Sequence, residues 1–409
     1  MEMTECAIVG AAITNWIPSG EPTPLLMDRL AEAAIKALRE AKLTPGELDA
    51  IICNTSSIPF DSPAFITSSA QHFAHRLAER IGIREAQCMN VSAACASAAI
   101  AFSAATSMAK SGLIKKVLIA GIDNSPRGFY LPEQSYLDPD PYAAAIKVIG
   151  ATNPAYWAMW ARRRAYEMGK DVEDIKRLMA LVKEIHSQYG ALNPYARYRK
   201  IFTADEVLKS PLVCDPLHLY MICATCSGGG AVVVTDMETA KKITDKPVKV
   251  AASAVGGPLY GEPMPRLRVF STYKKLKPFT EWRKPIEKAY KIAGITAEDI
   301  DIIECHDTSC FHTINWIDQI MGWEREETDN LIRKRQIRHD GELPVNLSGG
   351  TASFGESVYS QAFMMLHELF RQLRGEAQER QAKKNLKIGV CAAYGAYGAY
   401  GCIILEKGW

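Results

Sequence analysis

The chain contains an internal repeat. The stretch ALREAKLTPGELDAIICNT at residues 37–55 aligns without gaps with AYKIAGITAEDIDIIECHD at 289–307, an offset of 252 residues (301 − 49). A second pair follows in the same order, with MNVSAACASAA from residue 89 matching LPVNLSGG at 343–350. Chance does not readily produce two similarities in the same order. We therefore interpret the chain as a duplication of one folding unit.

Each copy predicts alternating strands and helices. The first pair of segments is typical of the end of an amphipathic helix, a Thr-led acidic turn and a buried strand. The second pair leads through a helix into apolar strands at 115–123 and 386–395. This alternation predicts two βαβαβ halves with mostly parallel strands covered by helices. The helix SAAIAFSAATSMAKSG is apolar nearly all round, so we expect it between two sheets in a layered α/β protein.

A segment of different composition separates the strands of the first half. Residues 125–215 are rich in aromatic residues and arginine, as in NPAYWAMWARRRAYEMG and LNPYARYRKIFT, and contain two Asn-Pro turn signals. We predict a mostly helical insertion over one end of the sheets. The first half then comprises residues 1–124 and 216–245, and the second half comprises residues 246–409.

Composition and charge exclude several classes of protein. A net charge of +2 over 409 residues argues against a broad nucleic-acid surface. No apolar run reaches the ~18–20 residues that span a bilayer. The N-terminus is acidic and enters a strand-like run at once, which indicates a cytoplasmic protein. We expect the eleven cysteines to be free thiols, and the CxxC of Cys223 and Cys226 lacks a second ligand pair for a metal.

Cys95 is the first candidate for chemistry. It stands in VSAACASAA, where an apolar strand gives way to a helix and the neighbouring side chains are small. A thiol at a helix N-terminus has a lowered pKa, which favours the nucleophilic thiolate. Free cysteines are also among the most buried residues, so the alternative is a position in the core.

The repeat predicts which segments lie near Cys95. It places ECHDTSCF at 304–311 and NLSGGTASFGES at 346–357 at the same level of the fold. His306 ends an apolar strand, where reacting groups gather in open parallel sheets. A histidine there, beside a cysteine that begins a helix, is a nucleophile–base arrangement, and the alternative is a purely structural histidine.

Two glycine-rich stretches follow strands. The turn Ser348-Gly349-Gly350 leads into a helix and suits close approach of a thioester or phosphate, or it is a tight turn without a ligand. The stretch CAAYGAYGAYG at 391–401 begins with Cys391, and its alternative is a close-packed loop at the centre of the molecule.

Together these motifs resemble those of thiolases, the coenzyme A-dependent enzymes that make or cleave 3-oxoacyl thioesters. VSAACASAA resembles the nucleophile segment of that family. HDTSCFHTINWID, LNPYARYRK and VNLSGG…QLRGEA look like its sterol-carrier-type and archaeal branch. The resemblance covers nearly the whole chain and implies the thiolase fold, with layers in the order α-β-α-β-α.

The resemblance also implies roles for individual residues. Cys95 would be the nucleophile that accepts the acyl group, and His306 would orient the thioester oxygen or a water in a first oxyanion hole. The backbone N–H groups at Cys95 and in the loop from Gly395 to Gly398 would form a second oxyanion hole.

The chain departs from the family pattern in its acid/base residues. Thiolases usually carry Gly-His-Pro after the Ser-Gly-Gly turn, and here Glu356 stands at the histidine position. A carboxylate can accept a thiol proton, but a pKa near ~4.3 makes it a weak base unless burial raises that pKa. Cys391 lies near the position of the second acid/base, with Ala392 at the alternative register. The acid/base is therefore open among Glu356, His306 and Cys391.

The activity implied by the resemblance is CoA-dependent thiolytic cleavage of a 3-oxoacyl-CoA through an acyl-cysteine. The missing histidine and the aromatic residues Tyr156, Trp157 and Trp160 favour a bulky substrate. The resemblance implies that this substrate is benzoylsuccinyl-CoA, which would give benzoyl-CoA and succinyl-CoA. One alternative is a thiolase-like retro-aldolase that acts on the side chain of an acyl-CoA. The other is a non-catalytic scaffold subunit with the thiolase fold.

The resemblance implies partners as well. We expect acyl-CoA and CoA as substrates and no permanently bound cofactor, with Arg197, Arg199 and Lys200 as candidates for contacts with CoA. A homodimer through the N-terminal halves is expected, together with a small zinc-ribbon and OB-fold subunit that would hold any zinc.

Overall fold

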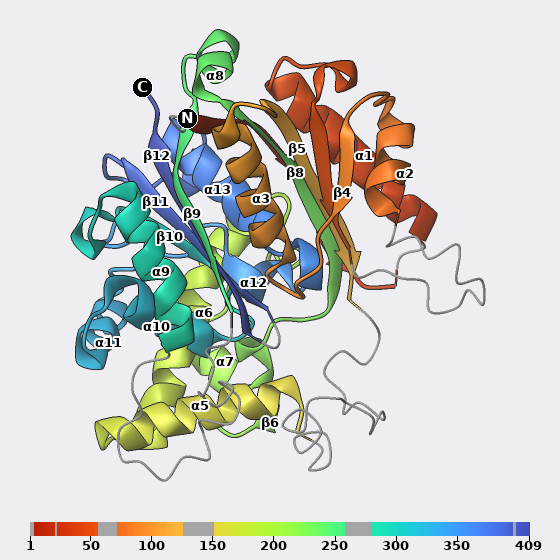
Figure 1. Cartoon of the computed structure of the whole chain (residues 1–409). Coiled ribbons are helices and arrows are strands. Elements are labelled where there is room, and N and C mark those ends of the chain that lie inside the picture. The colour runs from red at the N-terminus through yellow and green to blue at the C-terminus, as the bar shows by residue number, and fades with distance from the viewer. Residues whose placement is uncertain (1–3, 21–22, 56–71, 126–150, 258–279, 396–397) are drawn as a thin grey trace.

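The computed structural model describes residues 4–20, 23–55, 72–125, 151–257, 280–395 and 398–409. Its strands form one mixed β-sheet in the order β10-β11-β12-β9-β1-β8-β5-β3-β4, to which β2 adds by pairing with β8 (Figure 1). A separate hairpin is formed by β6 and β7. The strands are β1 (Cys6–Ile13), β2 (Ile17–Pro18), β3 (Ala50–Asn54), β4 (Gln87–Asn90), β5 (Lys116–Asn124), β6 (Leu212–Cys214), β7 (Leu217–His218), β8 (Cys226–Asp236), β9 (Val248–Gly256), β10 (Ile302–Cys305), β11 (Ile388–Gly395) and β12 (Ala399–Lys407).

The strand pairing repeats the duplication seen in the sequence. In the first half, β3 pairs in parallel with β4 and β5, whereas β8 is antiparallel to β5 and β1. In the second half, β10 pairs in parallel with β11, and β12 is antiparallel to β11 and β9. A parallel bridge from Ile303 to Val345 takes the place that β4 has in the first half. The two halves join where β1 and β9 pair over two residues.

The prediction of a mostly parallel sheet is wrong. The last strand of each half, β8 or β12, runs antiparallel to both of its neighbours. Parallel strands need a crossover, usually a helix, whereas antiparallel strands can follow each other through a short turn. Only three residues separate β11 from β12, so their pairing has to be antiparallel.

Equivalent side chains hold the two copies in the same way. The Oδ2 atom of Asp49 accepts hydrogen bonds from the backbone N–H groups of Lys115 and Lys116, both at 2.8 Å. Its repeat partner Asp301 accepts bonds from the N–H groups of Lys387 and Ile388, at 2.7 and 3.0 Å. Each aspartate thus ties the start of one parallel strand to the next, which accounts for an aspartate at both positions of the repeat.

The helices form the predicted layers around the sheet (Figure 1). Helices α3 and α13 contact strands of both halves and make the middle layer, whereas α1, α2 and α8 cover the outer face of the first half. Helices α9, α10 and α11 lie on the side of the second half. Their bounds are α1 (Thr23–Glu40), α2 (Phe73–Ile81), α3 (Ser97–Ser111), α8 (Met237–Ile243), α9 (Thr280–Ala293), α10 (Cys310–Met321), α11 (Arg325–Arg333), α12 (Gly350–Phe354) and α13 (Ala362–Arg374).

The middle layer is possible because α3 is made of small residues. Ala98, Ala99, Ala101 and Ala105 are fully or almost fully buried. A Cβ atom added to Gly401 on β12 would lie 2.8 Å from the Cβ of Ala99, so helix and strand approach closely. The burial predicted for this helix is confirmed, and its N-terminus, where Cys95 lies, is held between the two halves.

The insertion between β5 and β8 contributes α5 (Asn153–Met168), α6 (Val172–Leu192) and α7 (Ala204–Lys209), which lie at one end of the sheet (Figure 1). Residues 126–150 of the predicted insertion lie outside the described residues. Arg164 of α5 is buried and forms ion pairs with Asp318 of α10 and Asp329 of α11, the latter at 2.7 Å. Within the described ranges, no helix is long and apolar enough to cross a membrane.

Candidate active site

Cys95 lies in a strained turn that leads from β4 into α3. The preceding residue, Ala94, has a φ of +48°, in the left-handed region that non-glycine residues seldom adopt. Ser97 holds this turn, because its hydroxyl accepts a hydrogen bond from the N–H of Ala93 at 2.7 Å and donates one to the carbonyl of Ala94 at 2.6 Å. Backbone strain of this kind persists where the surroundings enforce it, and it is concentrated at functional sites.

Three of the predicted side chains meet in one cluster. Nε2 of His306 lies 2.7 Å from Oε2 of Glu356, and the same carboxylate lies near enough to the Cys95 thiol to raise its pKa. His306 and Glu356 have no exposed surface, whereas Cys95 retains 8 % of its own. Of the three, only Cys95 retains any exposed surface.

The backbone on both sides of Glu356 is fixed against the start of β8. The N–H of Glu356 donates to the carbonyl of Ala224 at 2.7 Å, and its carbonyl accepts from the N–H of Cys226 at 3.2 Å. The preceding residue, Gly355, has a φ of +94°, and a Cβ atom there would lie 2.8 Å from the Ala224 oxygen. Oε1 of Glu356 accepts a hydrogen bond from the N–H of Val358 at 3.0 Å, which orients the carboxylate.

His306 is held from three sides at the end of β10. Its N–H donates to the carbonyl of Ala392 at 2.9 Å, and its carbonyl accepts from the indole N–H of Trp316 at 2.9 Å. Nδ1 of its ring lies 3.0 Å from the carbonyl oxygen of Tyr394. Both ring nitrogens therefore have partners within the protein, and neither is directed at a place for a thioester oxygen.

The protonation states follow from burial and from Glu356. Burial raises the pKa of the Cys95 thiol well above its usual value, and the Glu356 carboxylate and then Asp123 raise it further. The expected lowering of this pKa at the helix N-terminus is therefore wrong for the unliganded site. Burial opposes the charged form of His306, but Glu356 outweighs that effect and raises the pKa of the imidazole.

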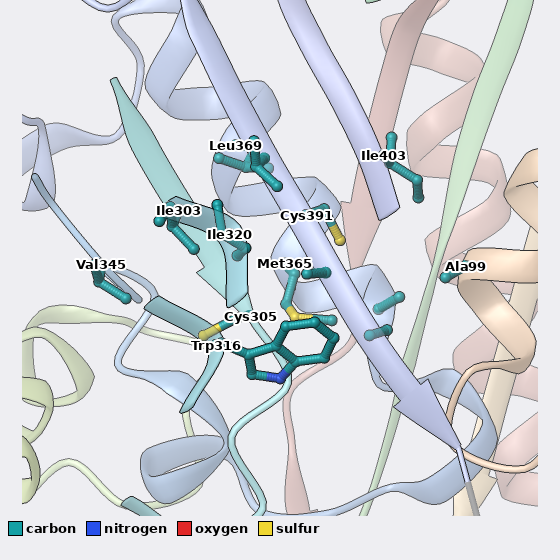
Figure 2. Close-up of a cluster of buried hydrophobic side chains, with 14 of the residues drawn as sticks. Ala99, Ile303, Cys305, Trp316, Ile320, Val345, Met365, Leu369, Cys391 and Ile403 are labelled. Atoms are coloured by element: carbon teal, nitrogen blue, oxygen red, sulfur yellow. The ribbon is translucent and has the colours of Figure 1, made fainter. Parts of the chain in front are cut away.

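Cys391 lies elsewhere. It sits on β11 in the apolar cluster shown in Figure 2, together with Met365, Leu369 and Ile403, and has no exposed surface. Burial raises the pKa of its thiol, and Cys402 and then Glu304 raise it further. The structure thus places Cys391 in the core and not with the Cys95–Glu356–His306 cluster.

Gly395, at the end of the same strand, does reach Cys95. A Cβ atom on Gly395 would lie 2.5 Å from the carbonyl oxygen of Ala93 and 3.0 Å from the backbone nitrogen of Ala96, so only glycine permits this approach. Gly398 has a φ of +92° in the turn before β12. Residues 396–397 of the predicted oxyanion loop lie outside the described residues.

The Ser348-Gly349-Gly350 turn is fully engaged inside the protein. The hydroxyl of Ser348 donates to Oε2 of Glu304 at 2.7 Å. A Cβ atom on Gly349 would lie 2.6 Å from the Cα of Gly190 on α6, and one on Gly350 would lie 2.5 Å from Oδ2 of Asp307. The three residues of this turn are buried, as expected for the alternative of a tight turn without a ligand.

The basic residues proposed for CoA lie on the loop after α6. Arg197 is half-buried and donates to the carbonyl of Thr225, next to the segment that holds Glu356. Arg199 and Lys200 are exposed. The loop is fastened to α12 by a hydrogen bond from the N–H of Tyr198 to the carbonyl of Ser353 at 2.9 Å.

An aromatic cluster links the insertion to the site. Trp157 and Trp160 are buried and lie edge-on to His312, with ring centroids 5.3 and 5.7 Å away. His312 is stacked on Tyr394, whose ring lies 4.9 Å from that of His306. Sequence reasoning missed His312 and Tyr394, although both belong to motifs that it had singled out, because their contacts span three separate segments.

No group of three or more His, Cys, Asp or Glu side chains in the described ranges is arranged to hold a metal ion. This includes Cys223 and Cys226, whose backbones instead bind the segments that carry Thr308 and Glu356. The N–H of Cys223 donates to the carbonyl of Thr308 at 3.0 Å, and the N–H of Cys226 donates to Glu356.

Comparisons with known proteins agree with the motifs. Residues 266–407 match the family described as "Thiolase C-terminal domain-like". The chain is 27% identical over 390 residues to an acetyl-CoA acetyltransferase of Methanothermobacter thermautotrophicus, covering 93% of this chain and 94% of the relative. It is also 27% identical over 238 residues to the benzoylsuccinyl-CoA thiolase subunit BbsB of Thauera aromatica, covering 58% of each chain.

Solved structures show the same fold. The "Ltp2-ChsH2(DUF35) aldolase" superposes with a TM-score of 0.81 at 21% identity and covers 100% of this chain and 99% of that one. Human mitochondrial 3-ketoacyl-CoA thiolase in complex with CoA superposes with a TM-score of 0.70 at 16% identity, covering 99% and 98%. The predicted resemblance to thiolases and the thiolase fold are confirmed, and the relatives support an acyltransferase enzyme.

Proposed function

We propose that this chain, with its thiolase fold, is a CoA-dependent acyltransferase that cleaves a 3-oxoacyl-CoA through an acyl group on Cys95. The observation that carries the proposal is the position of the thiol. It belongs to a buried cluster with Glu356 and His306, in which it alone keeps some exposed surface, and it lies just before a helix between the two halves. A nucleophile with an adjacent proton acceptor, itself oriented by a third group, is typical of covalent catalysis.

The reaction would proceed in two stages through a thioester. The sulfur of Cys95 attacks the 3-keto carbon, the adjacent carbon–carbon bond breaks, and free CoA then removes the acyl group. Backbone N–H groups beside the sulfur, from Cys95 and from the approach of Gly395, would stabilise the oxyanion that develops on the carbonyl oxygen. The acyl-enzyme divides one difficult step into two easier ones.

Acylation of Cys95 provides the direct test of this function. Incubation with a 3-oxoacyl-CoA should add the acyl mass to the Cys95 peptide in mass spectrometry, and Cys95→Ala should lose essentially all turnover. The control is Cys214→Ala, because Cys214 lies on β6 outside the cluster. An unlabelled Cys95 under turnover conditions would contradict the proposal and favour the scaffold alternative.

A retro-aldolase is the second candidate function. It is favoured by the superposition on the Ltp2-ChsH2(DUF35) aldolase over the whole chain. Such an activity would not need an acylated cysteine, so full activity of Cys95→Ala on a β-hydroxyacyl-CoA would replace our first proposal by this one.

For the substrate, we propose benzoylsuccinyl-CoA. The support is the match to subunit BbsB together with the aromatic character of the insertion. The purified protein should release benzoyl-CoA and succinyl-CoA faster than it cleaves acetoacetyl-CoA, as measured by chromatography of the CoA esters. A preference for the short aliphatic substrate would contradict this part of the proposal and leave the acyl-cysteine chemistry in place.

The proposed assembly contains a homodimer and a small zinc-ribbon and OB-fold subunit, in the cytoplasm. Strand β4 ends the sheet and pairs only with β3 among the described residues, so its outer edge can pair with a second copy. The name of the Ltp2-ChsH2(DUF35) aldolase indicates a second component in that protein. Light scattering of the purified chain and co-purification from the native host test these two contacts, and a fully active lone chain would contradict the second.

A further inference from the structure

We infer that Glu356 and His306 act as one proton carrier for Cys95: they hold a single proton between Oε2 and Nε2, and Glu356 receives the proton of the thiol. His306 is then a positioning residue that acts through Glu356. The catalytic meaning of this inference rests on the proposed function, but the arrangement of the proton can be tested without any substrate.

The proton count follows from the hydrogen-bond partners of His306. Its Nδ1 faces the carbonyl oxygen of Tyr394 at 3.0 Å, and a carbonyl can only accept, so Nδ1 must carry a hydrogen. Its Nε2 faces Oε2 of Glu356 at 2.7 Å. A lone pair on each atom would repel at this distance, so one proton lies between them. The pair is an imidazolium with a carboxylate, or an imidazole with a carboxylic acid.

Glu356 is the group that connects this proton to the thiol. Its Oε1 accepts from the N–H of Val358 at 3.0 Å, its Oε2 lies 2.7 Å from Nε2 of His306, and its charge raises the pKa of the nearby Cys95 thiol. The Val358 and His306 contacts place donors against both oxygens, as expected for a carboxylate that is held in its ionised, acceptor form. The Tyr394 carbonyl fixes which nitrogen of His306 faces Glu356, as the orienting groups of other histidines do.

Other ionisable groups near the cluster are engaged in different contacts. Asp123 faces Cys95 but accepts the N–H of Tyr359 at 3.0 Å, and Asp307 faces His306 but accepts the N–H of Thr351 at 2.6 Å. The remaining ionisable neighbours are His312 beside His306, Tyr394 and Cys226 beside Glu356, and Arg197 and Arg29 beside Cys226.

In the first half-reaction, the S–H bond of Cys95 breaks and the sulfur electron pair forms a bond to the 3-keto carbon, while the proton passes to Glu356. The carbonyl then reforms and the carbon–carbon bond breaks. Its electron pair leaves as the enolate of the second acyl-CoA, which takes the proton from Glu356. The proton shared with Nε2 of His306 stays in place and balances the charge of Glu356 whenever that carboxylate is ionised.

In the second half-reaction, the thiol of CoA gives its proton to Glu356 while its sulfur bonds to the acyl carbon. The sulfur of Cys95 leaves with its electron pair and takes that proton back. One carrier thus serves both half-reactions, which suits a structure in which Cys391 lies in the apolar core.

Alkylation of Cys95 by iodoacetamide tests the carrier. The rate is followed against pH by mass spectrometry of the Cys95 peptide in the full chain. Glu356→Gln removes a negative charge and an acceptor beside the thiol, so the midpoint should fall by about 1 pH unit or more. His306→Gln leaves the carboxylate without its cationic partner, so the midpoint should rise. Cys214, half-buried on β6, is the internal control and should not shift.

Opposite shifts in these two variants would support the carrier, because a loss of packing would not move the midpoint in opposite directions. Shifts of the same sign, or no shift in Glu356→Gln, would overturn it. Glu356→Asp keeps the charge, so its midpoint should stay closer to that of the wild type than the midpoint of Glu356→Gln does. If His306→Gln does not fold, this comparison decides for or against the carrier.

Turnover separates this inference from the proposed function. Glu356→Gln should increase the thiolate fraction at neutral pH and yet lower kcat by about 10²–10⁴-fold, the usual contribution of a general base. Opposite alkylation shifts without any acylation of Cys95 would refute the proposed function and leave the carrier standing. Acylation of Cys95 without alkylation shifts would refute the carrier alone.

Discussion

At the scale of single residues, the site depends on backbone positions that side-chain chemistry does not reveal. Ala94 at a φ of +48° directs Cys95, and Gly355 at +94° and Val358 at +55° flank Glu356. A positive φ at a non-glycine residue such as Ala94 or Val358 costs of order 1–3 kcal/mol and persists only when the surroundings enforce it, whereas glycine adopts it freely. The Cys95–Glu356–His306 cluster is thus held by unusual turns on both halves of the molecule.

Gly355→Ala should therefore damage both stability and turnover. The added Cβ would lie 2.8 Å from the Ala224 oxygen and 2.9 Å from the Cβ of Cys226, in addition to the positive φ. We expect a loss of roughly 3 kcal/mol in the free energy of unfolding, with lower kcat because Glu356 moves. Chemical denaturation and steady-state kinetics measure the two effects.

Gly375→Ala is the matched control. Gly375 has a φ of +74° at the end of α13, but an added Cβ would meet nothing within 4 Å. The Gly375→Ala variant should lose only about 1–2 kcal/mol in the free energy of unfolding and keep the wild-type kcat. Equal losses in the two variants would mean that the left-handed conformation alone, and not the contact with Ala224, makes Gly355 necessary.

Much of the cluster could be predicted from the sequence, because the repeat puts equivalent strand ends at one level. That reasoning brought Cys95, His306 and Glu356 together. It could not show that Nδ1 of His306 would be occupied by the carbonyl of Tyr394, since backbone carbonyls have no sequence signature. Nor could it show that the pKa of the Cys95 thiol is raised, because the burial that raises this pKa depends on the packed structure.

At the scale of secondary structure elements, the insertion is held to the second half by buried charge. Arg164 on α5 is paired with Asp318 on α10 and Asp329 on α11, and all three are nearly or fully buried. Trp157 and Trp160 of the same helix pack on His312, which in turn stacks on Tyr394. The orientation of α5 is therefore coupled to the residues that surround His306.

Arg164→Met should destabilise the protein strongly. It leaves buried Asp318 without its ion-pair partner and leaves Asp329 with only Lys170, at 3.6 Å; removing one partner of a buried pair costs about 3–5 kcal/mol in comparable cases. Arg162→Met on the same helix is the control, since Arg162 and its partner Asp215 are about half exposed and such pairs contribute about 0–1 kcal/mol. Urea unfolding of both variants measures the difference, and similar losses would contradict a special role for the buried pair.

The order of strands and helices was predictable, but the direction of the last strand in each half was not. Alternating strand and helix patterns indicated parallel pairing, and the pairs of β3 and β10 follow it. The connection from β11 to β12 contains only glycine, alanine and tyrosine, with no helix to carry a crossover. A short connection of this kind is the physical sign of an antiparallel pair.

At the scale of the whole molecule, buried histidines make stability depend on pH. Burial lowers the pKa of His367 on α13 well below its usual value, and Arg371 and Arg380 lower it further. As the pH falls below about 6.5, the unfolded chain binds a proton that folded His367 does not. The folded state therefore loses stability in acid, by up to about 1.4 kcal/mol per pH unit for this one group.

His367→Gln should remove that part of the acid sensitivity. A glutamine can still accept the hydrogen bond that Arg371 donates to Nε2 of His367 at 3.4 Å, and it does not titrate. The free energy of unfolding, measured in urea at pH 7 and pH 5, should fall less in this variant than in the wild type. His75→Gln on the exposed side of α2 is the control and should follow the wild type.

The shared middle layer bears on how such a molecule could have arisen. Helix α3 of the first half and α13 of the second each contact strands of both halves, so neither half covers its own central helix. A protein with one copy of the unit would have had to bind a second copy in order to bury that helix. Fusion of the two genes then turned an encounter between separate molecules into a step within one chain, and it allowed the thiol and the imidazole to be kept in different copies.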